Sequence, residues 1–173
     1  MQKTELRIHI YGEKPLRKRS SLVTKIDDKI LDLRNTMAEL MYSRQGIGLA
    51  APQVGVNKQL IIIDIGEGLV TLANPKISKK QGQSVMEEGC LSLPGVAVKV
   101  KRPNRVFVQA MNEFGKEVEF WAENLFARVI QHEADHLKGK LIIDYASLLK
   151  RLKTRAKFRN LLKQRGQGDV KLF

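Results

Sequence analysis

The stretch from Gln131 to Gly139 reads QHEADHLKG and places two histidines, His132 and His136, four residues apart. On a helix this spacing puts both imidazoles on one face, one turn apart, where they can bind a single metal ion. Glu133 follows the first histidine, close enough to handle the proton of a metal-bound water without itself binding the metal. The rest of the chain must then supply a third ligand and a substrate cleft.

The same pattern also arises by chance, and the two histidines would then be ordinary residues on the polar face of a helix. The flanking residues argue against this interpretation. The run from 124 to 137 contains Leu125, Phe126, Val129, Ile130 and Leu137, which predict a substantially buried helix. Unpaired polar groups in a buried helix cost several kcal/mol, and a metal would satisfy the histidines and the glutamate together.

Length and composition indicate a soluble globular protein. The 173 residues fit one domain with a sizeable core, and 43% hydrophobic with 28% charged residues is an ordinary balance. No apolar run is long enough to cross a bilayer, and residues 1 to 10 alternate rather than forming the apolar core of a signal peptide. We therefore expect a cytoplasmic protein without membrane contact.

Cys90 is the only cysteine, which excludes a disulfide within the chain. A lone cysteine is commonly a small buried apolar side chain. Beside a histidine helix it is also a candidate metal ligand, because one thiolate and two imidazoles form a known catalytic set with an open fourth position. Its position after Gly89 and before the apolar segment that ends at Pro94 suits a thiolate and an N–H presented from an edge strand.

The formal net charge of +13 favours association with polyanions such as nucleic acid or an anionic surface. Residues 146 to 173 contribute nine basic residues and one acidic residue, a local net charge of +8. Such a run is commonly just a solvated helix face. The segment has apolar residues at helical spacing and therefore predicts a basic helix from about 146 to 164, docked on the body through Leu148, Leu149, Leu152 and Ala156.

The remaining chain predicts an α+β fold. Residues 24 to 44 predict an amphipathic helix that begins at a capping box formed by Thr24 and Asp27. Strands are expected over 5 to 11, 58 to 65, 69 to 73, 96 to 100, 105 to 111 and 117 to 122. The order of strands, then the histidine helix, then the basic helix favours the α+β class.

Three stretches together resemble the peptide deformylase family: GIGLAAPQVG at 46 to 55, EGCLSLP at 88 to 94 and QHEADHLKG at 131 to 139. The first stretch alone would be either a loop or a place where a ligand approaches the backbone closely. The resemblance covers most of the chain and implies a single catalytic domain over residues 1 to 173. It further implies antiparallel and mixed β-sheets packed around a central helix that carries HEADH.

The function implied by the resemblance is removal of the N-formyl group from the N-terminal formylmethionine of new polypeptides, which gives formate and a free amino terminus. Cys90, His132 and His136 would bind one divalent metal with a water in the fourth position. Glu133 would take the proton of that water and return it to the departing amine. The donor set suits iron, zinc, nickel or cobalt, and the resemblance favours ferrous iron with zinc as a common substitute.

The resemblance also implies which residues bind the substrate. The Gln53 side chain and the Leu91 backbone N–H would stabilise the oxyanion. The substrate backbone would lie like an added strand, and its methionine would enter an apolar pocket. The residues expected at these places are Ile47, Gly48, Gly89, Leu125 and Val129. For Leu125 and Val129, ordinary helix core is an equally good explanation.

Two positions depart from the pattern of many family members. Ile142 stands where many have phenylalanine, and residues 147 to 149 read Ser-Leu-Leu where many have Ser-Pro-Leu. Neither position touches the predicted metal ligands or Glu133. They affect only what is expected of the pocket rim and of the last helix.

Two other functions compete with this interpretation. A zinc endopeptidase of the metzincin type needs a histidine at Ile142, and the other large class takes a glutamate from a later helix, whereas none follows Glu133. A basic RNA-binding protein without catalysis fits the charge, but only 6% of residues are aromatic and no stacking motif is present. Catalysis and RNA contact can coexist, and we expect the basic helix to dock on the ribosome, where the substrate emerges.

Overall fold

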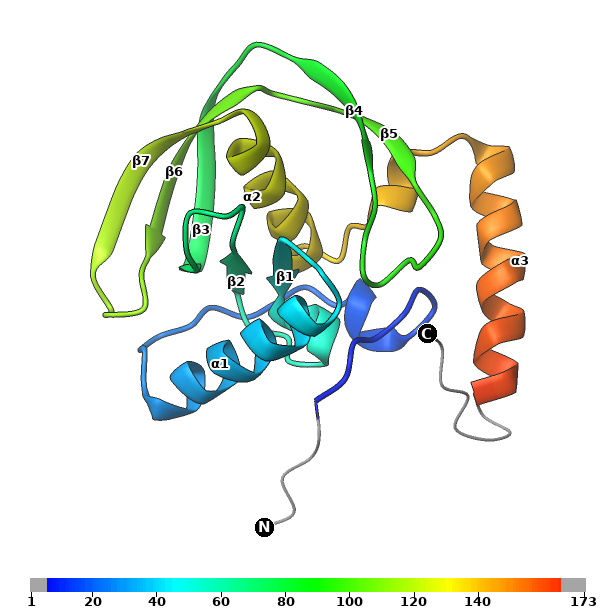
Figure 1. Cartoon of the computed structure of the whole chain (residues 1–173), viewed down its shortest axis with the longest axis horizontal. Helices are drawn as coiled ribbons and strands as arrows, with labels where there is room; N and C mark the ends of the chain where they lie inside the picture. Colours follow the sequence, from blue (N-terminus) through cyan, green and yellow to red (C-terminus); the bar gives the residue numbers. More distant parts are fainter. Residues whose placement is uncertain (1–5, 166–173) are drawn as a thin grey trace.

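The computed structural model describes residues 6 to 165 of the chain, which form helices and antiparallel sheets (Figure 1). The α-helices are α1 (Asp28–Ser43), α2 (Asn124–Leu137) and α3 (Leu148–Arg165), and the 3-10 helices are η1 (Lys14–Arg17), η2 (Ala51–Val54) and η3 (Ile142–Tyr145). A five-stranded sheet has the order β1 (Gly48–Ala50), β2 (Leu60–Ile63), β3 (Val70–Gln81), β6 (Arg105–Met111) and β7 (Glu117–Glu123). A separate two-stranded ribbon pairs β4 (Ser84–Glu88) with β5 (Val98–Arg102).

All pairs between these strands are antiparallel, so the predicted α+β class is confirmed. The predicted mixed sheet is not found in residues 6 to 165, where the only parallel contact is an isolated bridge between Ser21 and Lys58. The loop from 112 to 115 joins β6 and β7 as a hairpin, as expected from its Asn and Gly residues.

The inner face of the sheet packs against α2. Val106, Val108 and Ala110 alternate along β6 as buried residues, and they cluster with Ile130 of α2. All four residues of β2 are buried, because both faces of the strand are covered. Ile61 and Ile63 face the core that includes α2, and Leu60 and Ile62 face the core that includes α1. Figure 1 shows α2 between the sheet and the β4–β5 ribbon. Glu88, the last residue of β4, lies 3.0 Å from His132 of α2, so this end of the ribbon is beside the first histidine.

The N-terminal part of the chain differs from the expectation in two places. Residues 6 to 10 form no strand, although His9 N–H donates to Gln53 O at 2.7 Å and Tyr11 N–H donates to Ser92 O at 2.8 Å. Helix α1 is capped by Asp27, whose carboxylate accepts from Ile30 N–H at 3.1 Å, rather than by Thr24. A single residue that caps directly is sufficient to start the helix.

Helix α3 lies where the basic helix was expected, but it turns a different face to the body. Leu148, Leu149 and Leu152 are 72%, 63% and 56% exposed, and Ala156 is exposed as well, so the expected docking through these four residues is wrong. Phe158 is buried instead, against Leu16 and Leu93 among others. Neither α3 nor any other helix within residues 6 to 165 is both long and apolar enough to cross a membrane.

Candidate metal centre

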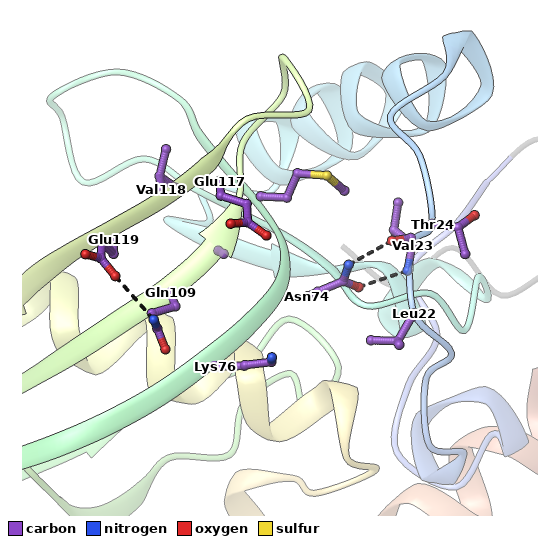
Figure 2. A pocket seen from close by; sticks show the side chains of 11 residues that line it. Leu22, Val23, Thr24, Asn74, Lys76, Gln109, Glu117, Val118 and Glu119 are labelled. Carbon is purple, nitrogen blue, oxygen red and sulfur yellow. Dashed lines mark hydrogen bonds between the residues drawn. The ribbon is translucent and has the colours of Figure 1, made fainter.

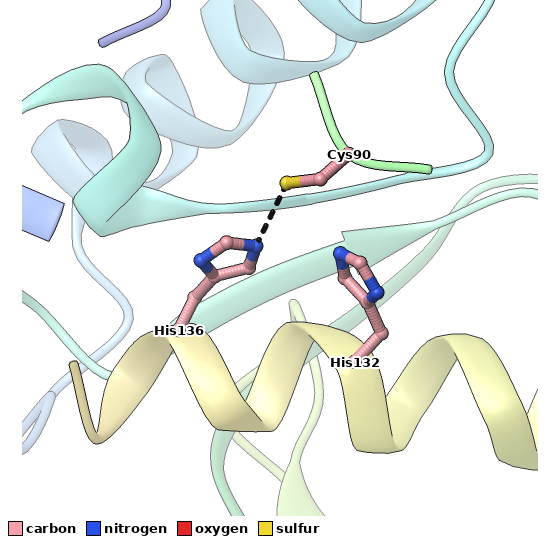
Figure 3. Close-up of side chains that lie close together, drawn as sticks. All are labelled: Cys90, His132 and His136. Carbon is pink, nitrogen blue, oxygen red and sulfur yellow. Dashed lines mark hydrogen bonds between the residues drawn. The ribbon is translucent and has the colours of Figure 1, made fainter. Parts of the chain in front are cut away.

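Three predicted ligands from two distant segments meet at one point. His132 and His136 lie on the same face of α2 with their ring centroids 5.2 Å apart. Cys90 follows the end of β4, and its Sγ lies 3.3 Å from His136 Nε2 (Figure 3). One ligand atom from each of the three side chains lies within 4.8 Å of the others. Ligands around a tetrahedral metal are about 3.3 to 3.6 Å apart, a spacing that Cys90 Sγ and His136 Nε2 already have.

Both imidazoles are buried at the candidate metal centre, and their surroundings affect their protonation in opposite directions. His132 Nδ1 lies 3.0 Å from Glu88 Oε2, and because a carboxylate only accepts, Nδ1 carries the proton and leaves Nε2 for the metal. Burial, followed by the positive charge of His132, lowers the pKa of His136 well below its usual value, which favours the neutral imidazole. Burial would also lower the pKa of His132, but its hydrogen bonds with Cys90 and Glu88 outweigh this and raise the pKa well above its usual value, so a metal would replace the proton on Nε2. Both rings are buried, which excludes the interpretation of solvent-facing helix histidines.

Glu88 is the centre of a buried network of charges that sequence reasoning missed. Arg102 donates to both Glu88 oxygens at 2.7 and 2.9 Å, and Arg128 donates to Oε1 at 2.7 Å. Burial alone would raise the pKa of Glu88, but the hydrogen bonds from His132 and Arg102 outweigh it and lower the pKa to about 2. Arg102 also pairs with Asp135 on α2 at 2.9 Å. The sequence did contain a signal that Arg102 is buried, because Arg102 follows Val98 and Val100 at the alternate positions of β5 that face inward.

Glu133 lies beside the ligands and is only 4% exposed. Its Oε2 is buried and has no hydrogen-bond partner in the described part of the chain. Burial raises the pKa of Glu133 to about 7, because the charged form loses its hydration. The space next to it is limited, since a Cβ added to Gly48 would lie 2.6 Å from Glu133 Oε1.

Gln53 presents its amide nitrogen to the same point. The side chain is buried, and Oε1 accepts from Ala50 N–H at 2.8 Å, which fixes the orientation of the amide. Nε2 donates to Ser92 Oγ at 3.1 Å and lies 3.5 Å from Cys90 Sγ. Leu91 follows Cys90 directly, and its N–H donates to no backbone carbonyl within residues 6 to 165.

An open cleft of about 400 Å³ is lined by all five residues expected to bind the substrate. It is also lined by Gln53, Cys90, Leu91, His132 and Glu133. Leu125 is 43% exposed there, and so is not ordinary helix core, whereas Val129 is buried. Sequence reasoning did not identify Met86, Glu87 and Arg128, which also line the cleft. The signal for Met86 and Glu87 was weak, because β4 is short and largely exposed. Arg128 lies on α2, where a buried arginine is not expected from the sequence.

A second and larger cavity, of about 730 Å³, lies on the other face of the sheet (Figure 2). Lys76 of β3, Gln109 of β6 and Glu119 of β7 line it, and the segment Leu22 to Thr24 forms its opposite side. Gln109 donates to Glu119 at 3.2 Å, so these two polar groups already satisfy each other. None of the predicted site residues borders this cavity, which we therefore separate from the candidate site.

A cysteine and two histidines around one point, with a buried carboxylate on the wall of an open cleft, define the class of metal-dependent hydrolases. A family model described as polypeptide deformylase matches residues 5–152 of the chain. Peptide deformylase 1 from Clostridium acetobutylicum is 51% identical over 137 residues, which cover 79% of this chain and 91% of the relative. A peptide deformylase from Clostridium botulinum is 52% identical over 137 residues, with 79% and 93% covered.

Solved structures agree with the sequence comparisons. The crystal structure of a peptide deformylase from Legionella pneumophila matches with a TM-score of 0.86 and 38% identity, covering 94% of this chain and 98% of that one. A peptide deformylase from Synechococcus elongatus, solved in complex with actinonin, gives a TM-score of 0.83 and 42% identity, with 91% and 87% covered. The chain belongs to the polypeptide deformylase family, hydrolases that depend on a divalent metal and remove the N-formyl group from newly made polypeptides.

Proposed function

We propose that this chain is a single catalytic domain that hydrolyses the formyl amide of N-terminal formylmethionine in the cleft beside α2, its central helix. The observation that carries the proposal is the meeting of Cys90, His132 and His136 ligand atoms within 4.8 Å, next to a buried Glu133 oxygen without a partner. A hydrolysis needs such a proton acceptor at the reacting atoms. The family places this activity on nascent chains, which supports a cytoplasmic role.

The three ligands would bind one divalent ion, for which ferrous iron is our first choice and zinc, nickel or cobalt also suit the donors. Such an ion, when bound, lowers the pKa of a water toward 7 and polarises a carbonyl oxygen. Three protein ligands would leave such an ion a position for water, and two of them, Cys90 and His132, line the cleft. An iron-loaded enzyme with this thiolate would lose activity in air.

Glu133 would accept the proton of the water that attacks the formyl carbon, and would deliver it to the amine nitrogen as the C–N bond breaks. A carboxyl group whose pKa lies close to neutrality is suited to both transfers. The negative charge that develops on the formyl oxygen would be stabilised by Gln53 Nε2 and by Leu91 N–H. Because Ala50 N–H fixes the Gln53 amide, this donor would need little reorganisation during the reaction.

The substrate backbone would extend the sheet at β1. This strand is at the edge of the five-stranded sheet, and of the strands within residues 6 to 165 it pairs only with β2, so its other side is available to another strand. Ile47 and Gly48 would pair with the substrate on this side and Gly89 on the other. The methionine side chain would contact Ile47, Leu125 and Val129, of which the first two are exposed at the mouth of the cleft.

We also propose contact between α3 and the ribosome. Its described basic residues include Lys153, Arg155 and Arg159, which are exposed, and a cationic helix is attracted to RNA phosphates. The exposed leucines at the start of α3 add apolar surface beside this charge. Docking here would keep the enzyme near emerging formylated chains.

The first experiment is anaerobic release of formate from formyl-Met-Ala-Ser by the wild type and by Glu133→Ala, with bound metal assayed in both. We expect Glu133→Ala to retain its metal and to lose activity by about 10²-fold to 10⁴-fold, the usual contribution of a general base. Glu119→Ala, on the far side of the sheet, is the matched control and should be as active as the wild type. A metal-loaded wild type that releases no formate would overturn the proposed function.

A further inference from the structure

Arg128 is a buried residue near the candidate metal centre, and its side chain donates four hydrogen bonds although no role has been assigned to it. It lies on α2 one helical turn before His132, and it is only 5% exposed. Its guanidinium donates to Glu88 Oε1 at 2.7 Å, to Val100 O at 3.1 Å, and to Ser84 O and Oγ at 2.9 and 2.7 Å. One side chain of α2 thus contacts both strands of the β4–β5 ribbon.

The ribbon needs such a link. Its two strands pair with each other and with no other strand among residues 6 to 165. An isolated two-stranded ribbon is marginally stable, so its position depends on what it packs against. Arg128 contacts the ribbon at Ser84, where β4 begins, and at Glu88, where β4 ends.

The end of β4 determines the geometry of two predicted ligands. Glu88 holds the imidazole of His132 through Nδ1 at 3.0 Å, and Cys90 follows only two residues later. Movement of Glu88 would therefore turn His132 and displace the Cys90 thiolate together. The second link between the ribbon and α2, from Arg102 to Asp135, reaches the helix on the other side of His132.

We propose that Arg128 is a positioning residue for the metal centre: it locks the β4–β5 ribbon onto α2 so that Cys90 and His132 are aligned before the metal binds. The inference rests on the proposed metal-binding role of Cys90, His132 and His136. Arginine is required because only its planar fork can donate to a carboxylate, two carbonyls and a hydroxyl from one position, whereas lysine has a single nitrogen.

Arg128→Lys tests the proposal, since it retains the positive charge beside Glu88 but not the fork. The measurement is the dissociation constant of Zn²⁺ by competition with a chelator, together with thermal unfolding of the metal-free protein. We expect metal binding to weaken by about 10-fold to 100-fold, as for other residues that orient metal ligands. Arg105→Lys, an arginine paired with Glu123 on the five-stranded sheet, is the matched control and should bind Zn²⁺ like the wild type.

Ser84→Ala gives a second test that does not disturb the buried charges. It removes one acceptor of Arg128 and leaves the other three, so we expect the same effect on Zn²⁺ binding in smaller size. If Arg128→Lys does not fold, this variant alone decides. Unchanged Zn²⁺ binding in the folded variants, with only a lower unfolding temperature, would show that Arg128 is merely structural and would overturn the proposal.

Two comparisons separate this proposal from its alternatives. If Arg128 acts through Glu88, adding Arg128→Lys to a Glu88→Gln variant should weaken Zn²⁺ binding less than it does in the wild type. Arg128 also lines the cleft, so it could contact the substrate directly. Kinetics of the metal-loaded Arg128→Lys variant distinguish the two roles. Loss of a substrate contact would raise KM alone, whereas misplacement of the metal ligands would lower kcat. The two proposals can fail separately. If the wild type releases no formate but the Arg128 variants still bind Zn²⁺ more weakly, the proposed function is overturned and the role of Arg128 is supported.

Discussion

Gln53 is the residue whose proposed role, as an oxyanion donor, depends on how a single side chain is oriented. It is buried, and its amide oxygen is bound by Ala50 N–H, yet its nitrogen is directed to the cysteine end of the cleft. We predict that Gln53→Ala retains its metal and loses turnover of formyl-Met-Ala-Ser by about 100-fold, the usual effect of removing one oxyanion donor. Gln109→Ala, on the far face of the sheet, is the control. Turnover equal to that of the wild type in Gln53→Ala would refute the role.

Two cleft glycines allow a matched comparison. A Cβ at Gly48 would lie 2.6 Å from Glu133 Oε1 and 2.7 Å from Val129 Cγ1, whereas a Cβ at Gly89 would have no atom of the described residues within 4 Å beyond its own chain neighbours. We predict that Gly48→Ala lowers the free energy of unfolding by about 1 to 3 kcal/mol, the usual cost of overpacking, and that Gly89→Ala leaves it unchanged. Urea unfolding of both metal-free variants measures this. Equal stability of the two variants would show that the Glu133 carboxylate moves aside freely.

The sequence alone predicted the side chains that meet at the candidate metal centre, because His132, His136 and Cys90 belong to motifs with fixed spacing. It did not identify Arg102 and Arg128, since a charged residue in a basic chain is expected at the surface. Their partner Glu88 lies 14 and 40 residues away, and only the fold brings them together. Spacing predicts local geometry, whereas a buried network between distant segments requires the tertiary structure.

At the scale of elements, periodicity predicted the positions of long segments and missed short ones. The apolar pattern of 124 to 137 coincides with α2, and the run around 60 coincides with β2. Strand β1 has three residues and most of β4 is exposed, so neither gives a pattern, and β3 continues beyond Pro75 to Gln81. In α3 the choice of face failed because the helix packs through Phe158, with Leu161 and Leu162 partly buried beside it, and not through the leucines of its first turns.

The contact between η1 and η3 gives a prediction about pH. Arg17 donates to both Asp144 oxygens at 2.6 and 2.9 Å. Burial alone would raise the pKa of Asp144. The hydrogen bonds from Arg17 and from Leu141 N–H have the larger, opposite effect, so the pKa lies below its usual value. A carboxyl group with a lowered pKa stabilises the fold above its unfolded pKa of about 3.9, and this contribution disappears as pH falls through the folded value.

We therefore predict that Asp144→Asn unfolds more easily than the wild type at pH 7, by about 0.5 to 1 kcal/mol, because the pair is partly exposed to solvent. Urea unfolding at pH 7, 5 and 3 checks this. The difference should be the same at pH 7 and pH 5 and should shrink toward pH 3. A difference that is undiminished at pH 3 would show that the carboxylate charge does not stabilise this contact.

At the scale of the whole molecule, catalysis and surface charge occupy different parts of the chain. The family model ends at residue 152, whereas α3 extends to Arg165 and carries much of the positive charge. Removing α3 would also expose Leu16, Leu93 and their neighbours, because Phe158 and Leu161 pack there. A deletion would therefore confuse lost charge with lost packing, and surface substitutions give a cleaner test of ribosome contact.

The triple variant Lys153→Glu, Arg155→Glu and Arg159→Glu reverses three exposed charges of α3 and leaves Phe158 in place. We predict that it releases formate from a short peptide at the wild-type rate but sediments with ribosomes much less at low salt. Each lost phosphate contact should lower the slope of log K against log salt by about 0.7 to 0.9. The control reverses Lys29, Lys80 and Lys116, which are exposed elsewhere and change the net charge equally. If both variants lose sedimentation equally, the attraction belongs to the +13 charge of the whole protein; only a selective loss in the α3 variant makes this helix the docking element.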